Sequence, residues 1–185
     1  MRFESFSFAP ELIQALDELN YHTLTPIQRA AIPAVRKGKD VLASAQTGTG
    51  KTAAFALPII QKLFESDSST TNAPSALVLA PTRELAEQIA NNFKDFAKYT
   101  QLKVVSLFGG VNTAGQEIAL KEGVDVVVAT PGRLLDHIRL GNLSLAQVKH
   151  LVLDEADRML DMGFINDMQS VIKSCADERQ ILLFS

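Results

Sequence analysis

The fold of this chain is decided by eight residues, Ala45-Gln46-Thr47-Gly48-Thr49-Gly50-Lys51-Thr52. They follow an apolar run at 40–44 and open an amphipathic stretch at 51–64, so the local order is strand, loop, helix. Backbone N–H groups in such a loop point inward at phosphate oxygens, and the helix N-terminus adds a partial positive charge. The stretch therefore predicts a phosphate-binding P-loop in which Lys51 reaches the β- and γ-phosphates and Thr52 ligates Mg²⁺.

The loop departs from one standard pattern and overlaps with another. The usual P-loop begins with Gly, whereas this one begins with Ala45. Gly48, Gly50 and Ala53 also fit the dinucleotide-binding pattern GxGxxA, which needs an acidic residue near the end of the second strand to hold a ribose. The second apolar run ends in Leu79-Ala80-Pro81, without an acid, so the sequence favours the P-loop.

Short apolar runs alternate with longer amphipathic stretches along the whole chain. The expected strands are 40–44, 76–80, 103–108, 124–129, 150–153 and 180–184. The expected helices are 26–35, 51–64, 83–99, 112–121, 134–139 and 165–174. This alternation predicts an α/β fold with a mostly parallel central sheet and helices on both faces. The polar segment 66–72 predicts a surface loop.

Composition excludes several classes of protein. The 185 residues suit one domain, and 46% apolar with 21% charged residues is ordinary for a globular protein. No apolar run is long enough for a membrane span, and the acidic N-terminus does not resemble a secretory signal. A single cysteine excludes an internal disulfide and favours a cytoplasmic location. The net charge is −3 and no basic run is present, so the charge alone does not indicate a nucleic-acid partner.

Two carboxylates follow the apolar run at 150–153, namely Asp154 and Glu155. In P-loop enzymes an Asp at such a strand tip holds the Mg²⁺ that bridges the phosphates, which predicts that role for Asp154. Glu155 points elsewhere and is the candidate base for an attacking water. The alternative is a helix N-terminus with favourably placed acids.

The acidic run and several other short segments together resemble the motifs of a known protein family. Asp154-Glu155-Ala156-Asp157 spells D-E-A-D and, with the P-loop, resembles the DEAD-box ATP-dependent RNA helicases. Other matching segments, in the family's order, are Thr25–Gln28 with Tyr21 and Phe3 before it (the Q motif), Pro81–Ala86 (motif Ia), Gly109-Gly110 and Thr130–Arg133 (motif Ib). The run 154–164 is similar to the RhlE-type bacterial branch. Asn20 stands where the family usually has Gly, which predicts a positive φ there.

The resemblance implies a RecA-like P-loop NTPase domain, the first (N-terminal) of two. Residues 1–36 would form the Q-motif region and 37–185 the P-loop core. The chain stops one residue after the strand-like run 180–184, at what would be the first residue of motif III, Ser185. We therefore expect a second RecA-like domain that is absent from this chain.

The resemblance also implies roles for individual residues. ATP would contact Phe3, Tyr21, Gln28 and the P-loop 45–52, with Gln28 reading the N7/N6 edge of adenine and Tyr21 stacking on the base. Mg²⁺ would be held by Thr52 and Asp154, and the catalytic residues would be Lys51, Asp154 and Glu155. The RNA backbone would meet Pro81, Thr82, Arg83, Gly109, Gly110, Thr130, Pro131, Gly132 and Arg133. Coupling between motifs would involve Asp157 and Ser185.

The sequence thus predicts the ATP- and RNA-binding domain of an RNA helicase, monomeric, without a membrane partner and nearly inactive in isolation. Two alternatives stay open: an ATP-gated RNA-binding module without activity of its own, and a related DNA helicase. A GTPase is disfavoured because the guanine motif Asn-Lys-x-Asp is absent.

Overall fold

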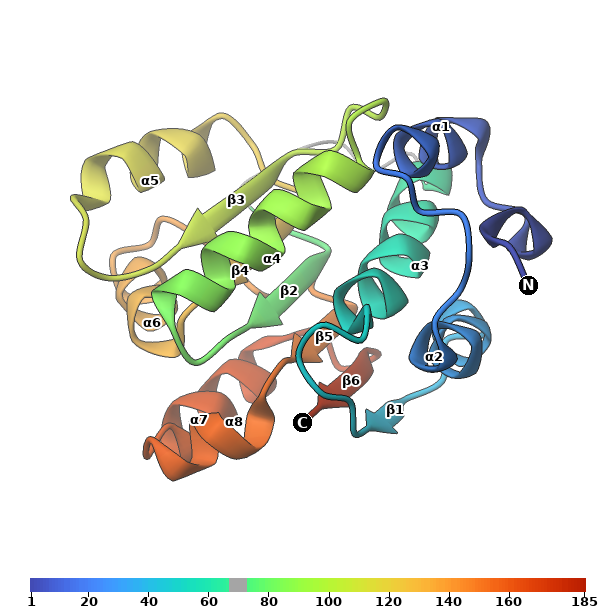
Figure 1. Ribbon diagram of the computed structural model, residues 1–185. Coiled ribbons are helices and arrows are strands. Elements are labelled where there is room, and N and C mark those ends of the chain that lie inside the picture. The colour runs from blue at the N-terminus through green and yellow to red at the C-terminus, as the bar shows by residue number, and fades with distance from the viewer. Residues whose placement is uncertain (67–72) are drawn as a thin grey trace.

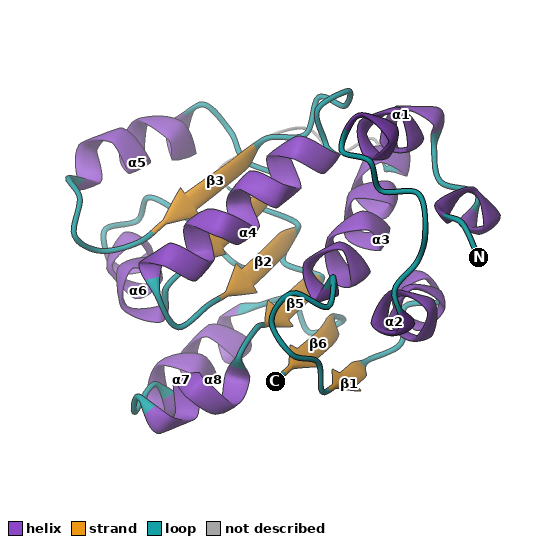
Figure 2. Cartoon of the chain, viewed as in Figure 1, coloured by secondary structure: helices purple, strands orange, loops and turns teal. Residues whose placement is uncertain are grey.

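A parallel β-sheet forms the centre of the molecule. The computed structural model describes residues 1–66 and 73–185, so all but the first residue of the loop expected at 66–72 lies outside the described residues. The strands are β1 (Val41–Ala43), β2 (Ala76–Leu79), β3 (Val104–Leu107), β4 (Val126–Ala129), β5 (His150–Leu153) and β6 (Gln180–Phe184). Their order in the sheet is β1-β6-β5-β2-β4-β3, and every pair of neighbours is parallel (Figures 1 and 2).

Helices cover both faces of this sheet. They are α1 (Pro10–Glu18), α2 (Pro26–Arg36), α3 (Lys51–Glu65), α4 (Arg83–Phe96), α5 (Thr113–Lys121), α6 (Pro131–Arg139), α7 (Ala156–Asp161) and α8 (Ile165–Ser174). In β2, Val78 joins the apolar cluster beneath α1–α4, while its neighbour Leu77 joins the cluster that includes residues of α5–α8. Because side chains alternate along a strand, one sheet supplies two cores. The predicted α/β architecture is confirmed.

Two helices were not expected, and several boundaries differ from the expected ranges, by three residues at the end of α4 and at the start of α6 and by one or two elsewhere. α1 and the six-residue α7 were not predicted from the apolar periodicity, and the short 3₁₀ turn Phe3–Phe6 also precedes them. The sixth helix begins at Pro131 rather than at residue 134, because Pro131 occupies the first turn, where its missing N–H costs nothing. α7 is too short for apolar periodicity to reveal it.

The all-parallel arrangement decides where the loops gather. Since all six strands run the same way, the segments that follow them gather at one edge of the sheet, the edge formed by the carboxyl ends of the strands. The P-loop, the acidic pair and the three candidate RNA segments all leave from this edge. Among residues 1–66 and 73–185, no helix is both long enough and apolar enough to cross a membrane.

Candidate functional site

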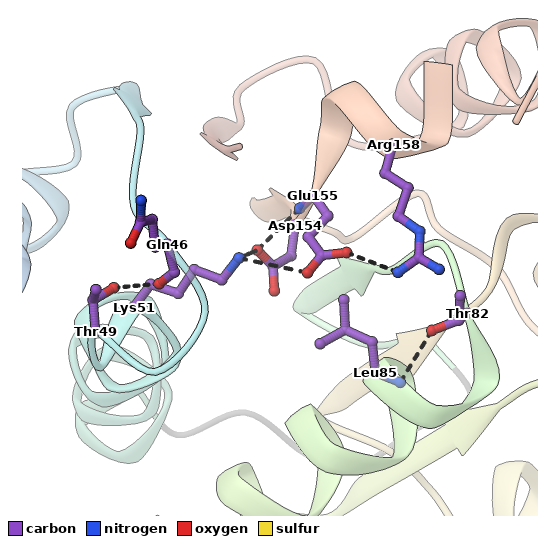
Figure 3. A network of polar contacts seen from close by, with 8 residues as sticks. All are labelled: Gln46, Thr49, Lys51, Thr82, Leu85, Asp154, Glu155 and Arg158. Carbon is purple, nitrogen blue, oxygen red and sulfur yellow. Dashed lines mark hydrogen bonds and ion pairs between the residues drawn. The ribbon is translucent and has the colours of Figure 1, made fainter. Parts of the chain in front are cut away.

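The P-loop curls between β1 and α3 and ends in a left-handed residue. Gly50 has φ +81° and precedes the first turn of α3. The Thr49 hydroxyl donates to the Gln46 carbonyl at 2.6 Å, which closes the loop on itself (Figure 3). A Cβ at position 50 would collide with the side-chain amide nitrogen of Gln28. The loop conformation therefore requires glycine at this point, both for its φ and for the close approach.

Lys51 connects the loop to the acidic strand end. Its Nζ lies 3.1 Å from Asp154 Oδ1 and 4.0 Å from Glu155 Oε1 (Figure 3). Glu155 has φ +49°, an uncommon conformation for a non-glycine residue, and its Oε2 lies 3.3 Å from Arg158 Nη1. The two carboxylates thus share one lysine but have different second partners.

Asp154 is fully buried and only half satisfied. Its Oδ1 accepts from Lys51 and from the Glu155 backbone N–H at 3.0 Å, whereas Oδ2 has no hydrogen-bond partner among the described residues. Burial raises the pKa of this carboxyl, and the charge of Lys51 opposes that rise. A buried carboxylate oxygen without a partner is costly unless something else occupies it. Hard oxygen ligands beside a phosphate loop suit Mg²⁺, so Asp154 and Thr52 fit the metal.

A cavity of about 400 Å³ adjoins the P-loop. Its lining includes Tyr21, Gln28, Thr52 and Glu155 together with Gly48 and Gly50. The predicted positive φ at Asn20 is confirmed at +59° and turns the chain just before Tyr21. Phe3 lies outside this lining, because it is buried behind Tyr21 with the ring centroids 6.4 Å apart.

Gln28 is bound within the protein at both ends of its amide. Its Oε1 accepts from the Thr25 N–H at 2.9 Å, which forms a capping box at the start of α2. Its Nε2 donates to the Gly50 carbonyl at 3.1 Å, and the residue is buried. Gln28 therefore ties the N-terminal region to the P-loop, and reading adenine would require at least part of this bonding to be shared or exchanged.

A second, more open cleft of about 490 Å³ lies on the other side of Lys51. Asp157, Arg158 and Ser185 line it together with Glu155 and the start of the P-loop. Ser185 is joined to that start by its backbone, since its N–H donates to the Ala43 carbonyl and its carbonyl accepts from the Ala45 N–H. The two residues predicted to couple motifs therefore share a cleft with the P-loop.

The candidate RNA segments carry two arginines that rest on the segment after β3. The Arg83 guanidinium lies 5.0 Å from the Phe108 ring centroid, and the Arg133 Nη1 donates to the Val111 carbonyl at 3.2 Å. Thr82 caps α4 by accepting from the Leu85 N–H at 3.3 Å. Within the described residues, neither arginine forms an ion pair.

The other candidates flank these arginines. Pro81 and Pro131 are buried, Thr130 is the N-cap of α6, and Gly109, Gly110 and Gly132 are partly or fully exposed.

Sequence reasoning missed the residues beneath these loops. Gln116 and His137 are buried, and each hydrogen-bonds within this region. Gln116 breaks the apolar face of its helix, and a polar residue at such a position was the available signal.

Comparisons with known proteins agree with this geometry. A family model described as DEAD/DEAH box helicase matches residues 25–185. A protein called ATP-dependent RNA helicase DeaD from Buchnera aphidicola subsp. Acyrthosiphon pisum is 49% identical to this chain over 98% of its length. The protein of the same name from Escherichia coli is 46% identical to it over 99%. The crystal structure of a DEAD box protein from the hyperthermophile Methanococcus jannaschii covers all of this chain at 38% identity, with a TM-score of 0.89. The chain spans 30% and 29% of the two relatives and 50% of the solved chain.

Proposed function

The chain belongs to the DEAD/DEAH box helicase family, and on that basis we propose that it is the ATP- and RNA-binding domain of an ATP-dependent RNA helicase. The whole enzyme would couple ATP binding to RNA clamping and strand separation, and hydrolysis to release. The supporting relatives are about three times as long as this chain, so the activity is proposed for the longer protein.

The observation that carries the proposal is the Lys51–Asp154 pair with its unpartnered Oδ2. An ion pair buried at the mouth of a P-loop supplies one cation for phosphates and one anion for a metal. Lys51 is 8% exposed and Asp154 is fully buried, so water weakly screens either charge. The pair suits the β- and γ-phosphates with Mg²⁺, which neutralises their charge when bound.

The neighbouring residues divide the remaining roles. Thr52 and Asp154 would hold Mg²⁺, and Lys51 would turn from the carboxylates to the phosphates. Glu155 would orient and deprotonate the attacking water, with Arg158 fixing its second oxygen. Tyr21 would stack on adenine while Gln28 reads its edge, and Phe3 would support Tyr21 from behind.

The segments and the cleft at the carboxyl ends of the strands suit two further partners, RNA and a second RecA-like domain. The segments at 81–83, 109–110 and 130–133 would grip RNA phosphates, and the cleft with Asp157 and Ser185 would face a second RecA-like domain. Residues 154–164 predict an RhlE-type branch, whereas the similar relatives carry the name DeaD, so the branch stays a prediction. The cytoplasmic location also stays a prediction.

Nucleotide titrations test this proposal directly. The wild-type chain should bind ADP more tightly than GDP, and Gln28→Ala should reduce the preference by about 1–3 kcal/mol. Lys51→Ala should weaken both nucleotides. Equal ADP and GDP affinities in the wild type would remove the adenine-reading role from Gln28.

A second assay separates the proposed enzyme from its alternatives. The whole protein should hydrolyse ATP faster with single-stranded RNA than with DNA, while this chain alone should show little turnover. Stimulation by DNA alone would favour a DNA helicase. RNA binding without ATP turnover in the whole protein would favour an ATP-gated binding module.

A further inference from the structure

A network of buried hydrogen bonds lies directly beneath the candidate RNA segments. Gln116 of α5 and His137 of α6 are buried, with His137 Nε2 lying 2.8 Å from Gln116 Oε1. The other side of the imidazole, Nδ1, lies 3.1 Å from Asn142 Nδ2. Gln116 Nε2 lies 3.0 Å from the carbonyl of Phe108, the first residue after β3. These contacts join two helices to the segments that follow β3 and α6.

Each bond in this network has a defined direction. The Phe108 carbonyl can only accept, so Gln116 donates there with its Nε2, and its Oε1 must be the atom that faces His137. His137 therefore carries its proton on Nε2 and donates it to Gln116, while Nδ1 accepts from Asn142. Burial lowers the pKa of His137, which agrees with a neutral ring. The network thus specifies a single tautomer.

The same network reaches the two arginines. Arg133 Nη1 donates both to Gln116 Oε1 at 3.3 Å and to the Val111 carbonyl at 3.2 Å. Gln116 thus holds the start of the segment Phe108–Val111 and Arg133 holds its end. The ring of Phe108 in turn supports Arg83. One buried glutamine therefore fixes the segment on which both guanidinium groups depend.

We propose that Gln116 and His137 are positioning residues for RNA, holding the segment Phe108–Val111 and Arg133 ready for a phosphate backbone. This inference rests on the proposed RNA-binding function. Arg133 forms these two hydrogen bonds with Nη1 alone. Its Nη2 and Nε form no hydrogen bond with the described residues and can therefore donate to a phosphate. A guanidinium held in place loses less conformational freedom on binding than a free one.

The chain offers a matched control for burial and chemistry. His150 and Gln180 form a second histidine–glutamine pair, with Nδ1 and Oε1 3.3 Å apart. This pair lies at the opposite, amino-terminal ends of β5 and β6, away from the loops that carry the arginines. Replacing His150 therefore removes a similar hydrogen bond at a distance from the candidate RNA segments.

The test uses five forms of the 185-residue chain: wild type, Gln116→Leu, His137→Leu, His137→Gln and His150→Leu. Their affinities for a single-stranded oligouridylate and for ADP are measured by NMR titration, which resolves weak binding. We expect Gln116→Leu and His137→Leu to weaken RNA binding about threefold to tenfold, the range for one lost hydrogen bond. His137→Gln places an amide donor where Nε2 was and should restore affinity to within about twofold, as should the His150→Leu control. ADP affinity should stay unchanged throughout.

Other outcomes separate the inference from the function beneath it. RNA affinity that is equal in wild type, Gln116→Leu and His137→Leu, or lost equally in His150→Leu, would overturn the positioning role while leaving RNA binding intact. An absence of RNA binding by the wild type would overturn the proposed function together with the inference. The ¹⁵N spectrum of His137 gives an independent readout, because the network requires the neutral Nε2–H form and a Nδ1–H form would contradict it.

Discussion

At the scale of single residues, two neighbouring acids are given different environments. Asp154 is buried, and burial raises its pKa, while the adjacent Glu155 adopts a left-handed backbone and pairs with Arg158 on the exposed side. The turn between them points one carboxylate at the P-loop lysine and leaves the other at the border of both cavities. The backbone therefore suits the proposed division, in which Asp154 would hold the metal and Glu155 would act on water.

Substitutions of these acids should have separable effects in the whole enzyme. Asp154→Asn should weaken Mg²⁺-dependent ATP binding, because the amide removes the negative charge that would face the metal. Glu155→Gln should keep Mg²⁺–ATP affinity but slow hydrolysis by about 10²–10⁴, the usual contribution of a general base. Equilibrium binding and single-turnover hydrolysis measure the two quantities. Equal loss of nucleotide in both variants would place both carboxylates in the metal site.

At the scale of elements, the P-loop is shaped by contact with another helix. The side-chain amide of Gln28 in α2 occupies the space that a Cβ at Gly50 would need, and it donates a hydrogen bond to the Gly50 carbonyl. Helix α2 therefore supports the loop from outside. The conformation of the loop and the position of the N-terminal region are thus linked by one side chain.

Gly50→Ala should cost more than a left-handed backbone alone. The φ of +81° costs a non-glycine residue about 1–2 kcal/mol, and the collision with Gln28 adds to this. Gly48→Ala is the matched control, since Gly48 has φ +84° with nothing within 4 Å of the added Cβ. Urea denaturation and ADP titration compare the two. If both variants lose equal stability, Gln28 does not constrain the loop, whereas partial rescue of Gly50→Ala by Gln28→Ala would locate the constraint there.

The elements also show what the sequence can and cannot predict. Apolar runs located all six strands and most helices. The runs of β2, β4 and β5 are the clearest, because strands buried on both faces read as nearly unbroken apolar residues. Lys51 and Asp154, which form an ion pair in the structure, could be proposed from the sequence because their chemistry is tied to local spacing along a strand–loop–helix unit. The bonds of Gln28 to Gly50 and of Gln116 to His137 join residues about 20 positions apart. Such contacts depend on how helices pack, which periodicity does not encode.

At the scale of the whole molecule, buried ionisable groups link stability to pH. Burial lowers the pKa of His137 and of His150, so each is neutral in the folded protein at a pH where the unfolded chain binds a proton. Since the unfolded state then holds more protons, stability falls as pH falls below about 6.5. Asp125 and Asp154 act in the opposite sense, because burial raises their pKa.

The contribution of one histidine is therefore best measured as a difference. We expect His150→Gln to lose less stability than wild type between about pH 7 and 5, by at most about 1.4 kcal/mol per pH unit. Urea denaturation at a series of pH values gives both curves. Parallel curves would show that His150 titrates alike in the folded and unfolded states.

The single cysteine reports on the integrity of the whole fold. Cys175 is 6% exposed, and burial raises its pKa to about 11. Because only the thiolate reacts, modification by Ellman's reagent near pH 8 should be at least about 100-fold slower in the native chain than in urea. Rapid modification under native conditions would mean that the region around α8 opens readily.

The order of strands has a consequence for synthesis. β1 is an edge strand and, among the described strands, pairs only with β6, so the partner of Val41 is Leu182, near the other end of the chain. At about 5–20 residues per second, a ribosome delivers the two roughly 7 to 28 seconds apart. The nascent chain can pair β2, β3, β4 and β5 in that interval, while the P-loop strand waits unpaired. The strand that leads into the P-loop is therefore synthesised early but is the last of the six strands to be paired.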